Sequence, residues 1–234
     1  MSTRRIPRLS EVTVEPLGET ALLVCLGDRI ELELNRMVHA LAQAVQAQAP
    51  PWLRDCVPAY ASLALHFDPD RFDAGVDPFN VAQRWVRATI EGMSSTRGGG
   101  AGRLVEIAVR YGGEDGPDLA AVAAHTRLSP AEVVRRHAAV EYRVAMLGFA
   151  PGFPYLLGLD PSLATPRLAQ PRTRVAAGSV GIGGMQTGIY PREGPGGWQL
   201  LGRTDAVMFD PERDPPSLLL PGDRLRFVIE SGPA

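Results

Sequence analysis

The sequence contains no lysine, because all 24 residues of its lysine-plus-arginine count are arginine. A Schiff-base lysine, a Walker A lysine and the phosphate-binding lysine of a kinase are therefore excluded. The enzyme classes that depend on these groups are excluded with them. Any anion site in this chain must use arginine or backbone amides.

Cysteine and histidine are also scarce. The two cysteines, Cys25 and Cys56, lie in apolar stretches without C-x-x-C spacing, so we expect buried thiols in a protein of a reducing compartment. None of the four histidines has the i, i+4 spacing of a zinc-binding helix or a neighbouring cysteine pair. We therefore predict no metal site.

Long apolar runs and a positive net charge are missing as well. The longest purely apolar run covers residues 21–26, and the basic residues at the N-terminus are not followed by the apolar segment of a signal peptide. The formal net charge is -2, which provides no broad basic field for nucleic acid or anionic membranes. We expect a cytoplasmic protein that binds neither.

Glycine and proline are abundant, with 25 and 21 residues, which predicts many ordered turns in a chain of 234 residues. The stretch SSTRGGGAG at 94–102 consists mainly of small residues that cannot build a core. We therefore predict an N-terminal domain over residues 1–95, a linker over 96–102 and a second domain over 103–234.

The first domain shows both helical and strand patterns. Apolar residues recur at three- and four-residue steps over 31–48 and from 77 to about 91, which predicts two helices. Strands are predicted at 12–14, 21–26 and 60–67, the last by its strict alternation. The pattern is typical of a small α+β domain.

The second domain begins with an alternating strand at 104–109 and two short helices within 117–138. The second helix is predicted to start at Ser129, because Ser-Pro-Ala-Glu is a capping box. Short apolar runs separated by glycine and proline follow, which predicts a closed β-barrel with long functional loops. These runs cover 142–147, 174–182, 198–201, 206–209 and 224–229. The fold class predicted for the chain is therefore α+β.

The helix pair at 118–137 has the rhythm of a DNA-binding helix-turn-helix. However, Arg135 and Arg136 lie late in the second helix, whereas a recognition helix presents its N-terminal residues to the bases. A packing corner of two helices is the favoured interpretation.

Most of the candidate chemistry lies between residues 148 and 205. Arg172 and Arg174 precede a glycine-rich run at 178–184, a combination suited to a carboxylate or phosphate. The alternative is that these glycines are barrel bends and bulges. His137 ends a helix just before this region, where the helix dipole alone also favours a histidine. No G-x-S-x-G hydrolase elbow is present.

Seven motifs of the sequence stand out together: VPAYASLALHFDP at 57–69, YGGEDGPDL at 111–119, GFAPGFPYL at 148–156, PRTRVAAGSVGIGG at 171–184, QTGIYP at 186–191, PGGWQLLGRT at 195–204 and LLPGDRLRF at 219–227. With these motifs the chain resembles the family that contains the B subunit of 5-oxoprolinase, the histidine-kinase inhibitor KipI and proteins labelled allophanate hydrolase subunit 1. At Thr204-Asp205 the sequence departs from the pattern expected of that family, in which Thr-Pro is usual, and at Gly18-Glu19 an Asp more usually follows the glycine.

The resemblance implies a cyclophilin-like β-barrel as the second domain and a partner of the 5-oxoprolinase C-subunit or KipA type. A third subunit of the LamB/YcsF type completes the bacterial 5-oxoprolinase, which opens the lactam of 5-oxoproline to glutamate with consumption of ATP. ATP is therefore expected at the level of the complex, and the isolated chain is expected to be inactive.

Two classes of function remain open at this stage. In the first, the chain is an enzyme subunit, acting on 5-oxoproline or on an allophanate- or urea-type amide, and its barrel loops form one wall of a shared site. In the second, the loop with Phe149, Phe153 and Tyr155 docks onto a sensor histidine kinase as an inhibitor. Prolyl isomerisation rests on analogy of fold alone.

The candidate site residues follow from the enzyme interpretation. Arg172 is expected to grip a substrate carboxylate, and the amides of 178–184 to face a phosphate or oxyanion. We predict Arg172 and His137 as catalytic residues and the following as substrate-binding residues: Phe149, Pro151, Gly152, Phe153, Gly178, Ser179, Gln186, Tyr190, Gly197 and Trp198.

Overall fold

The computed structural model describes residues 12–93 and 102–230. The chain divides into two compact units, residues 1–100 and 101–234. Apart from Gly102, the linker predicted at 96–102 lies outside the described residues. The two units are described separately below.

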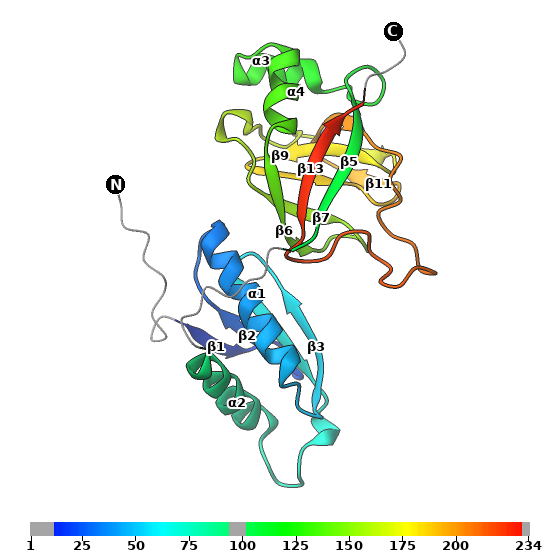
Figure 1. The fold of residues 1–234 in the computed structure, drawn as a ribbon. Helices are drawn as coiled ribbons and strands as arrows, with labels where there is room; N and C mark the ends of the chain where they lie inside the picture. Colours follow the sequence, from blue (N-terminus) through cyan, green and yellow to red (C-terminus); the bar gives the residue numbers. More distant parts are fainter. Residues whose placement is uncertain (1–11, 94–101, 231–234) are drawn as a thin grey trace, which may run out of the picture. The chain divides into compact units, whose positions relative to one another are not determined.

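The N-terminal unit is a four-stranded antiparallel sheet with two helices (Figure 1), and its strand order is β1-β2-β4-β3. The predicted helices and strands are confirmed, but the edge strand β3 was missed. The elements are β1 (Thr13–Pro16), β2 (Ala21–Cys25), α1 (Leu32–Ala47), β3 (Leu53–Pro58), β4 (Ser62–Phe67), a 3-10 helix (Pro69–Arg71) and α2 (Pro78–Gly92).

The core of this unit lies between the helices and one face of the sheet. Leu63 and Leu65 of β4 alternate into it, where they join Val38 and Leu41 of α1 and Val86 of α2. Burial of an aliphatic side chain of this size stabilises a fold by roughly 1.5–3 kcal/mol. The alternation in β4 and the helical spacing in α1 and α2 are thus both explained by one shared core.

The thiols of this unit differ in exposure. Cys56 is buried, and Cys25 is only half-buried, although both are free. Burial raises the pKa of the Cys56 thiol to about 11, which keeps it protonated at neutral pH. The expectation of buried thiols is therefore confirmed for Cys56 alone.

The second unit is a closed seven-stranded barrel, which confirms the predicted α+β class with a barrel domain (Figure 1). The strand order is β10-β7-β6-β13-β5-β12-β9, and β8 and β11 form a separate two-stranded sheet. The elements are β5 (Leu104–Tyr111), α3 (Leu119–Thr126), α4 (Pro130–Ala138), β6 (Glu141–Leu147), β7 (Pro154–Leu157), a 3-10 helix (Pro161–Leu163), β8 (Arg172–Val175), β9 (Ser179–Gly183), β10 (Gln186–Ile189), β11 (Gly194–Gly196), β12 (Gln199–Arg203) and β13 (Arg224–Ile229).

Two of the predicted barrel runs have to be corrected. The run at 174–182 is two strands, β8 and β9, separated by a turn in which Gly178 has a φ of 80°. The run at 206–209 is not a strand, since only Phe209 forms an isolated bridge, with Ser217. This segment is a loop held by Arg213, which donates to carbonyl oxygens of residues 207, 208, 215 and 216.

Helices α3 and α4 lie together at one end of the barrel (Figure 1). Val122 and Ala123 of α3 and Val133 of α4 belong to the barrel core. This burial gives the helix pair the packing role favoured from the sequence. Helix α4 begins as predicted, because the Ser129 hydroxyl accepts the Glu132 amide at 3.2 Å.

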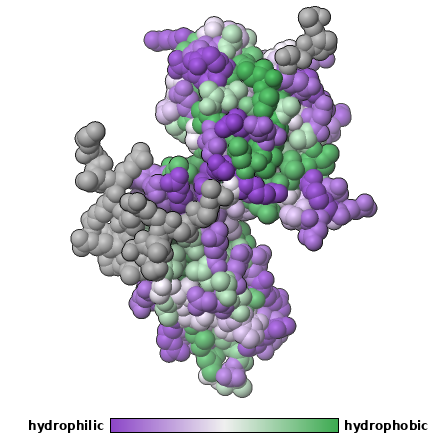
Figure 2. Space-filling view, viewed as in Figure 1, coloured by the Kyte–Doolittle hydropathy of each residue, from purple (hydrophilic) through white to green (hydrophobic). Residues whose placement is uncertain are grey.

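The surface of the barrel unit is mixed in character. The outward sides of β5 and β13 carry charged residues together with exposed Leu104, Val228 and Ile229, and hydrophobic patches among hydrophilic residues are visible in Figure 2. Within residues 12–93 and 102–230, no helix combines the length and the apolar character that crossing a membrane requires.

Candidate functional site

His137 lies inside the barrel and is fully buried. Its ring stacks on Phe227 at 4.7 Å between centroids, and both ring nitrogens are occupied. Nδ1 lies 2.8 Å from the Tyr111 hydroxyl, and Nε2 lies 3.0 Å from Thr187 Oγ1. A ring enclosed in this way has no path to a substrate, so His137 has a structural role in place of the catalytic one predicted.

The hydrogen-bond directions fix the tautomer of His137. The Thr187 hydroxyl donates its single proton to the carbonyl oxygen of Gly181 at 2.9 Å, so it must accept a proton from Nε2–H of the imidazole. Nδ1 then accepts the Tyr111 hydroxyl proton. Burial lowers the pKa of His137 to about 3, which keeps the ring neutral.

A second, smaller core lies on the outer side of the barrel wall. In β9, Val180 and Ile182 point into the barrel core, so Gly181 and Gly183 face the opposite side. Five aromatic residues gather there, and we call them the aromatic cluster. They are Phe149, Phe153, Tyr155, Tyr190 and Trp198.

Phe153 is the centre of the aromatic cluster. Its ring centroid lies 5.4 Å from Phe149, 5.0 Å from Tyr155, 5.3 Å from Tyr190 and 5.4 Å from Trp198. Most of these contacts are edge-to-face, the arrangement that aromatic quadrupoles favour. Four of the predicted substrate-binding residues are therefore brought together by loops from three different motifs.

Glycines of the barrel wall and of strand β11 make room for this cluster. A Cβ added at Gly183 would lie 2.6 Å from Trp198 Nε1, and one at Gly188 would lie 3.1 Å from Phe153. A Cβ at Gly196 would lie 2.3 Å from the Tyr190 hydroxyl. Side chains at these positions would displace the rings, which explains why glycine occurs inside strands that it otherwise weakens.

The amides of the glycine-rich run are not available to an anion, which corrects the role predicted for residues 178–184. Strand β9 has a hydrogen-bonded neighbour on each side, β10 and β12. The amide of Gly178 donates to Tyr190 and that of Gly184 to Thr165. The alternative interpretation, that these glycines shape the barrel, accounts for them.

Arg172 is held by a buried carboxylate. Its Nη2 donates to Oδ1 of Asp118 at 2.7 Å, and Oδ2 of Asp118 accepts the backbone amide of Leu200 at 2.7 Å. The other terminal nitrogen of Arg172, Nη1, is buried and has no hydrogen-bond partner among the described residues. Three motifs of the sequence thus meet at Asp118.

The remaining predicted residues surround the cluster at different depths. Gly152 packs on the backbone of Met208, which its missing side chain permits. Ser179 is buried and accepts the Tyr190 amide through its carbonyl. Three more lie in the surrounding loops and strand ends and stay predictions: Pro151, Gln186 and Gly197.

Two groups of this site escaped the sequence analysis. Arg167 lies over the Trp198 ring at 5.7 Å from its centroid, and Asp118 lies 54 residues before Arg172. No sequence signal indicates Arg167, because its contact with Trp198 joins residues 31 positions apart. Burial raises the pKa of both Tyr155 and Tyr190, so their hydroxyls stay protonated at neutral pH.

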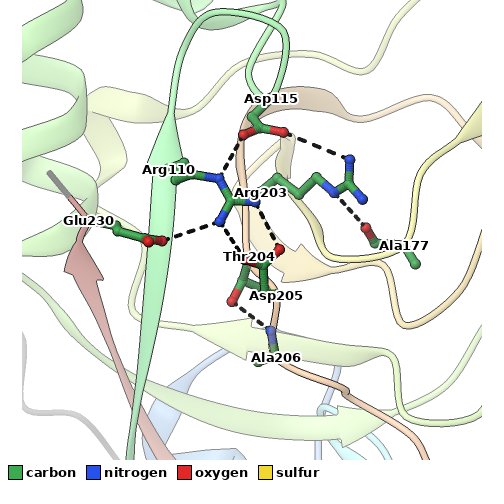
Figure 3. Close-up of polar contacts among 8 residues, drawn as sticks. All are labelled: Arg110, Asp115, Ala177, Arg203, Thr204, Asp205, Ala206 and Glu230. Carbon is green, nitrogen blue, oxygen red and sulfur yellow. Dashed lines mark hydrogen bonds and ion pairs between the residues drawn. The ribbon is translucent and has the colours of Figure 1, made fainter. Parts of the chain in front are cut away.

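A charged network surrounds Asp205 (Figure 3). Asp205 accepts two hydrogen bonds from Arg110, at 2.7 and 2.9 Å, in a bidentate pair. Arg110 also bonds Asp115 at 3.0 Å and Glu230 at 3.3 Å, and Arg203 lies 3.9 Å from Asp115. The Arg110 guanidinium lowers the pKa of Asp205 through these hydrogen bonds.

The site offers flat apolar rings and guanidinium groups. In the residues that the structure describes, no three His, Cys, Asp or Glu side chains are grouped so that they could hold a metal ion. Rings beside guanidinium groups suit an organic acid or an apolar protein anchor.

Residues 12–219 match the family model described as the carboxyltransferase domain, subdomain C and D. The chain is 43% identical to the 5-oxoprolinase B subunit of Bacillus subtilis (strain 168), covering 92% of this chain and 91% of that one. It is 45% identical to the 5-oxoprolinase B subunit of Escherichia coli O157:H7, covering 91% and 93%.

Solved structures show the same fold. The crystal structure of TTHA0988 has a TM-score of 0.77 and 41% identity, and it covers 92% of this chain but 40% of that chain, so this chain spans about two fifths of it. The Kluyveromyces lactis urea amidolyase, 22% identical with a TM-score of 0.76, shares the fold. With a family model matched over most of its length and two relatives above 40% identity, the chain belongs to the 5-oxoprolinase B-subunit family of carboxyltransferase C and D domains.

Proposed function

We propose that the chain is the B subunit of an ATP-dependent 5-oxoprolinase. It acts in a complex with a partner of the C-subunit or KipA type and a third subunit of the LamB/YcsF type. The support comes from the 43% and 45% identity to proteins named as the B subunit of 5-oxoprolinase, over more than nine tenths of their length. The proposed reaction opens the lactam of 5-oxoproline to glutamate with hydrolysis of ATP.

In this proposal the aromatic cluster forms one wall of a site that is shared with the partner. Trp198 and Arg167 present a flat ring beside a cation, which suits a small cyclic amide that carries a carboxylate. Arg172 acts mainly by fixing strand β8 to the start of helix α3, because one end of its guanidinium is already bonded to Asp118. The observation that carries the proposal is the identity to the two named B subunits, and the meeting of these motifs at one place on the barrel indicates where the shared site would lie.

The glycine-rich strand β9 does not fit the phosphates of ATP. The chain has no lysine, and the backbone amides of strand β9 are used in its hydrogen-bonded pairing with β10 and β12. A triphosphate needs a cradle of free amides or cationic side chains. We therefore propose that ATP binds to a different polypeptide of the complex and that the role of this chain lies in substrate contact and assembly.

The test is a reconstitution of the three purified subunits. We expect ATP hydrolysis that depends on 5-oxoproline when all three are present, and loss of this activity when the present chain is omitted. 2-Pyrrolidinone, which has the lactam but no carboxylate, is the control compound and is expected to be a poor substrate. Equal ATP hydrolysis with and without this chain would refute the proposal.

A further inference from the structure

Phe149 is the most exposed large apolar residue of the described chain, with 65% of its surface accessible. It also has a φ of 65°, in the left-handed region that bulky residues rarely adopt. The loop enforces this conformation. The amide of Ala150 donates to the carbonyl of Gly148 at 2.7 Å, and the amide of Phe153 donates to Ala150 at 3.0 Å.

The barrel unit does not need the ring of Phe149 for its own core. The cluster beneath it is already closed by Phe153, Tyr190 and Trp198, each no more than 5% exposed. Phe149 touches only the edge of this cluster, at 5.4 Å from Phe153 and 6.3 Å from Tyr190. A strained backbone and an aromatic ring in water are both unfavourable within the isolated unit.

We propose that Phe149 is the anchor residue through which this chain docks onto its partner, the C-subunit-type protein. The inference rests on the proposed function. Its relatives are named as one subunit of an enzyme, and in TTHA0988 the matching unit makes up 40% of a longer chain. The same unit therefore occurs with further polypeptide attached. Rigid aromatic side chains that are preorganised before binding are the usual energetic centres of protein interfaces.

The aromatic cluster that Phe149 borders indicates what the partner presents, because Arg167 lies over the Trp198 ring of this cluster. An apolar pocket accepts the ring, and an acidic group lies at the edge of that pocket. The acidic group faces Arg167, which is exposed and forms no ion pair with any residue in the described parts of the chain. A charge at the rim of an interface mainly accelerates association and makes it sensitive to salt.

The experiment measures binding rather than catalysis. The present chain is titrated with the purified C-subunit-type protein of the same organism by isothermal calorimetry. Phe149→Gly removes the ring, and glycine adopts a φ of 65° without strain, so the loop keeps its shape. We expect Kd to rise at least 30-fold, the loss typical of an interface hot spot. Arg167→Glu is expected to weaken binding about tenfold at low salt.

The matched control is Ile229→Ala, which removes another exposed apolar side chain, 49% accessible, from strand β13, three strands away from both β9 and β10 around the barrel. Its Kd is expected to stay within about threefold of the wild-type value, since scattered surface apolar residues contribute little. Circular dichroism and the thermal midpoint of Phe149→Gly are expected to stay close to those of the wild type, because relief of the strained φ offsets the greater freedom of glycine in the unfolded chain.

Three outcomes would overturn the inference. Equal affinity of wild type and Phe149→Gly would reject Phe149 as the anchor while leaving the proposed function intact. Normal partner affinity with a raised KM for 5-oxoproline would make Phe149 a substrate contact. Unfolding of Phe149→Gly would make it a residue of the barrel core. If the wild-type chain forms no complex at all, the proposed function fails as well.

Discussion

Arg172 and Asp118 form an ion pair across 54 residues of sequence, with 2.7 Å between Nη2 and Oδ1. The carboxylate is 11% exposed and the guanidinium 29%. Because Asp118 also accepts the Leu200 amide, the pair joins strand β8, the start of helix α3 and strand β12. The same arginine therefore supports the start of β12, next to Trp198 of the aromatic cluster.

Replacement of Arg172 by alanine is expected to lower the stability of the barrel unit. It leaves Asp118 buried without its cation, which costs roughly 2–3 kcal/mol for a pair of this exposure. Urea denaturation followed by circular dichroism measures the change.

Arg174 supplies the control on the same strand. It pairs with Glu193 in an exposed ion pair, with side chains 77% and 52% accessible, so Arg174→Ala is expected to cost less than about 0.5 kcal/mol. If Arg172→Ala is as stable as Arg174→Ala but turnover by the complex falls strongly, Arg172 is a substrate-binding residue and its role as a structural support is wrong.

Acid is expected to destabilise the barrel through His137. Burial lowers its pKa to about 3 in the folded state, whereas the unfolded chain has the ordinary value near 6.5. The unfolded state therefore binds more protons below pH 6.5, and stability falls as the pH falls from there toward 3. The contribution amounts to about 2 kcal/mol between pH 8 and pH 5.

Two variants separate this effect from the titration of other groups. His137→Gln cannot titrate in this range and is expected to lose about 2 kcal/mol of the pH dependence of stability. Its stability at pH 8 is expected to be lower, because the hydrogen bonds of the ring to Tyr111 and Thr187 are lost. His125→Gln, at an exposed position of helix α3, is expected to keep the wild-type slope. An unchanged slope in His137→Gln would show that another group governs acid unfolding.

Gly183→Ala is expected to destabilise the barrel unit, because its Cβ would lie 2.6 Å from Trp198 Nε1. Forcing an extra methyl group into packed surroundings costs roughly 1–3 kcal/mol. At Gly194, by contrast, an added Cβ meets nothing within 4 Å, so Gly194→Ala is expected to be neutral. Urea denaturation midpoints of the two variants, followed by circular dichroism, test this prediction. Equal midpoints would mean that the Trp198 ring moves aside without cost.

Asp205→Ala is expected to lower the thermal midpoint only at low ionic strength. Asp205 is 77% exposed, so its bidentate pair with Arg110 is screened by salt. The difference from the wild type should disappear in 1 M NaCl, where the Debye length is about 3 Å. Glu212→Ala removes an exposed carboxylate from the following loop and serves as the charge-matched control. A deficit that persists at high salt would point to backbone strain in the loop instead.

Local patterns predicted the regular elements of this protein well. Helix α1 and strand β4 follow a single periodicity over their whole length, since each has one face in the core. Strand β3 was missed because it is an edge strand in which Arg54 and Asp55 stand side by side, so its alternation is weak.

The site was harder to predict because its contacts join residues that lie far apart in the sequence. Glycine-rich strands such as β9 were interpreted as candidate anion loops, since glycine is unfavourable in strands. Their glycines are explained only by Phe153 and Trp198, which approach from distant loops. His137 gave no signal of its burial, because its neighbours Arg135 and Arg136 are polar and its partner Thr187 lies 50 residues away.

The barrel is closed by a parallel pairing between its first and last strands, in which residues 104–109 lie beside 224–229 in register. Partners such as Glu106 and Arg226 are 120 residues apart. During synthesis on the ribosome, strand β5 must therefore wait for almost the entire unit to emerge before it gains this neighbour. The N-terminal sheet has no such requirement, so it is free to fold first. The incomplete barrel exposes an unpaired strand edge, so we expect a chaperone to bind the nascent chain before strand β13 has emerged.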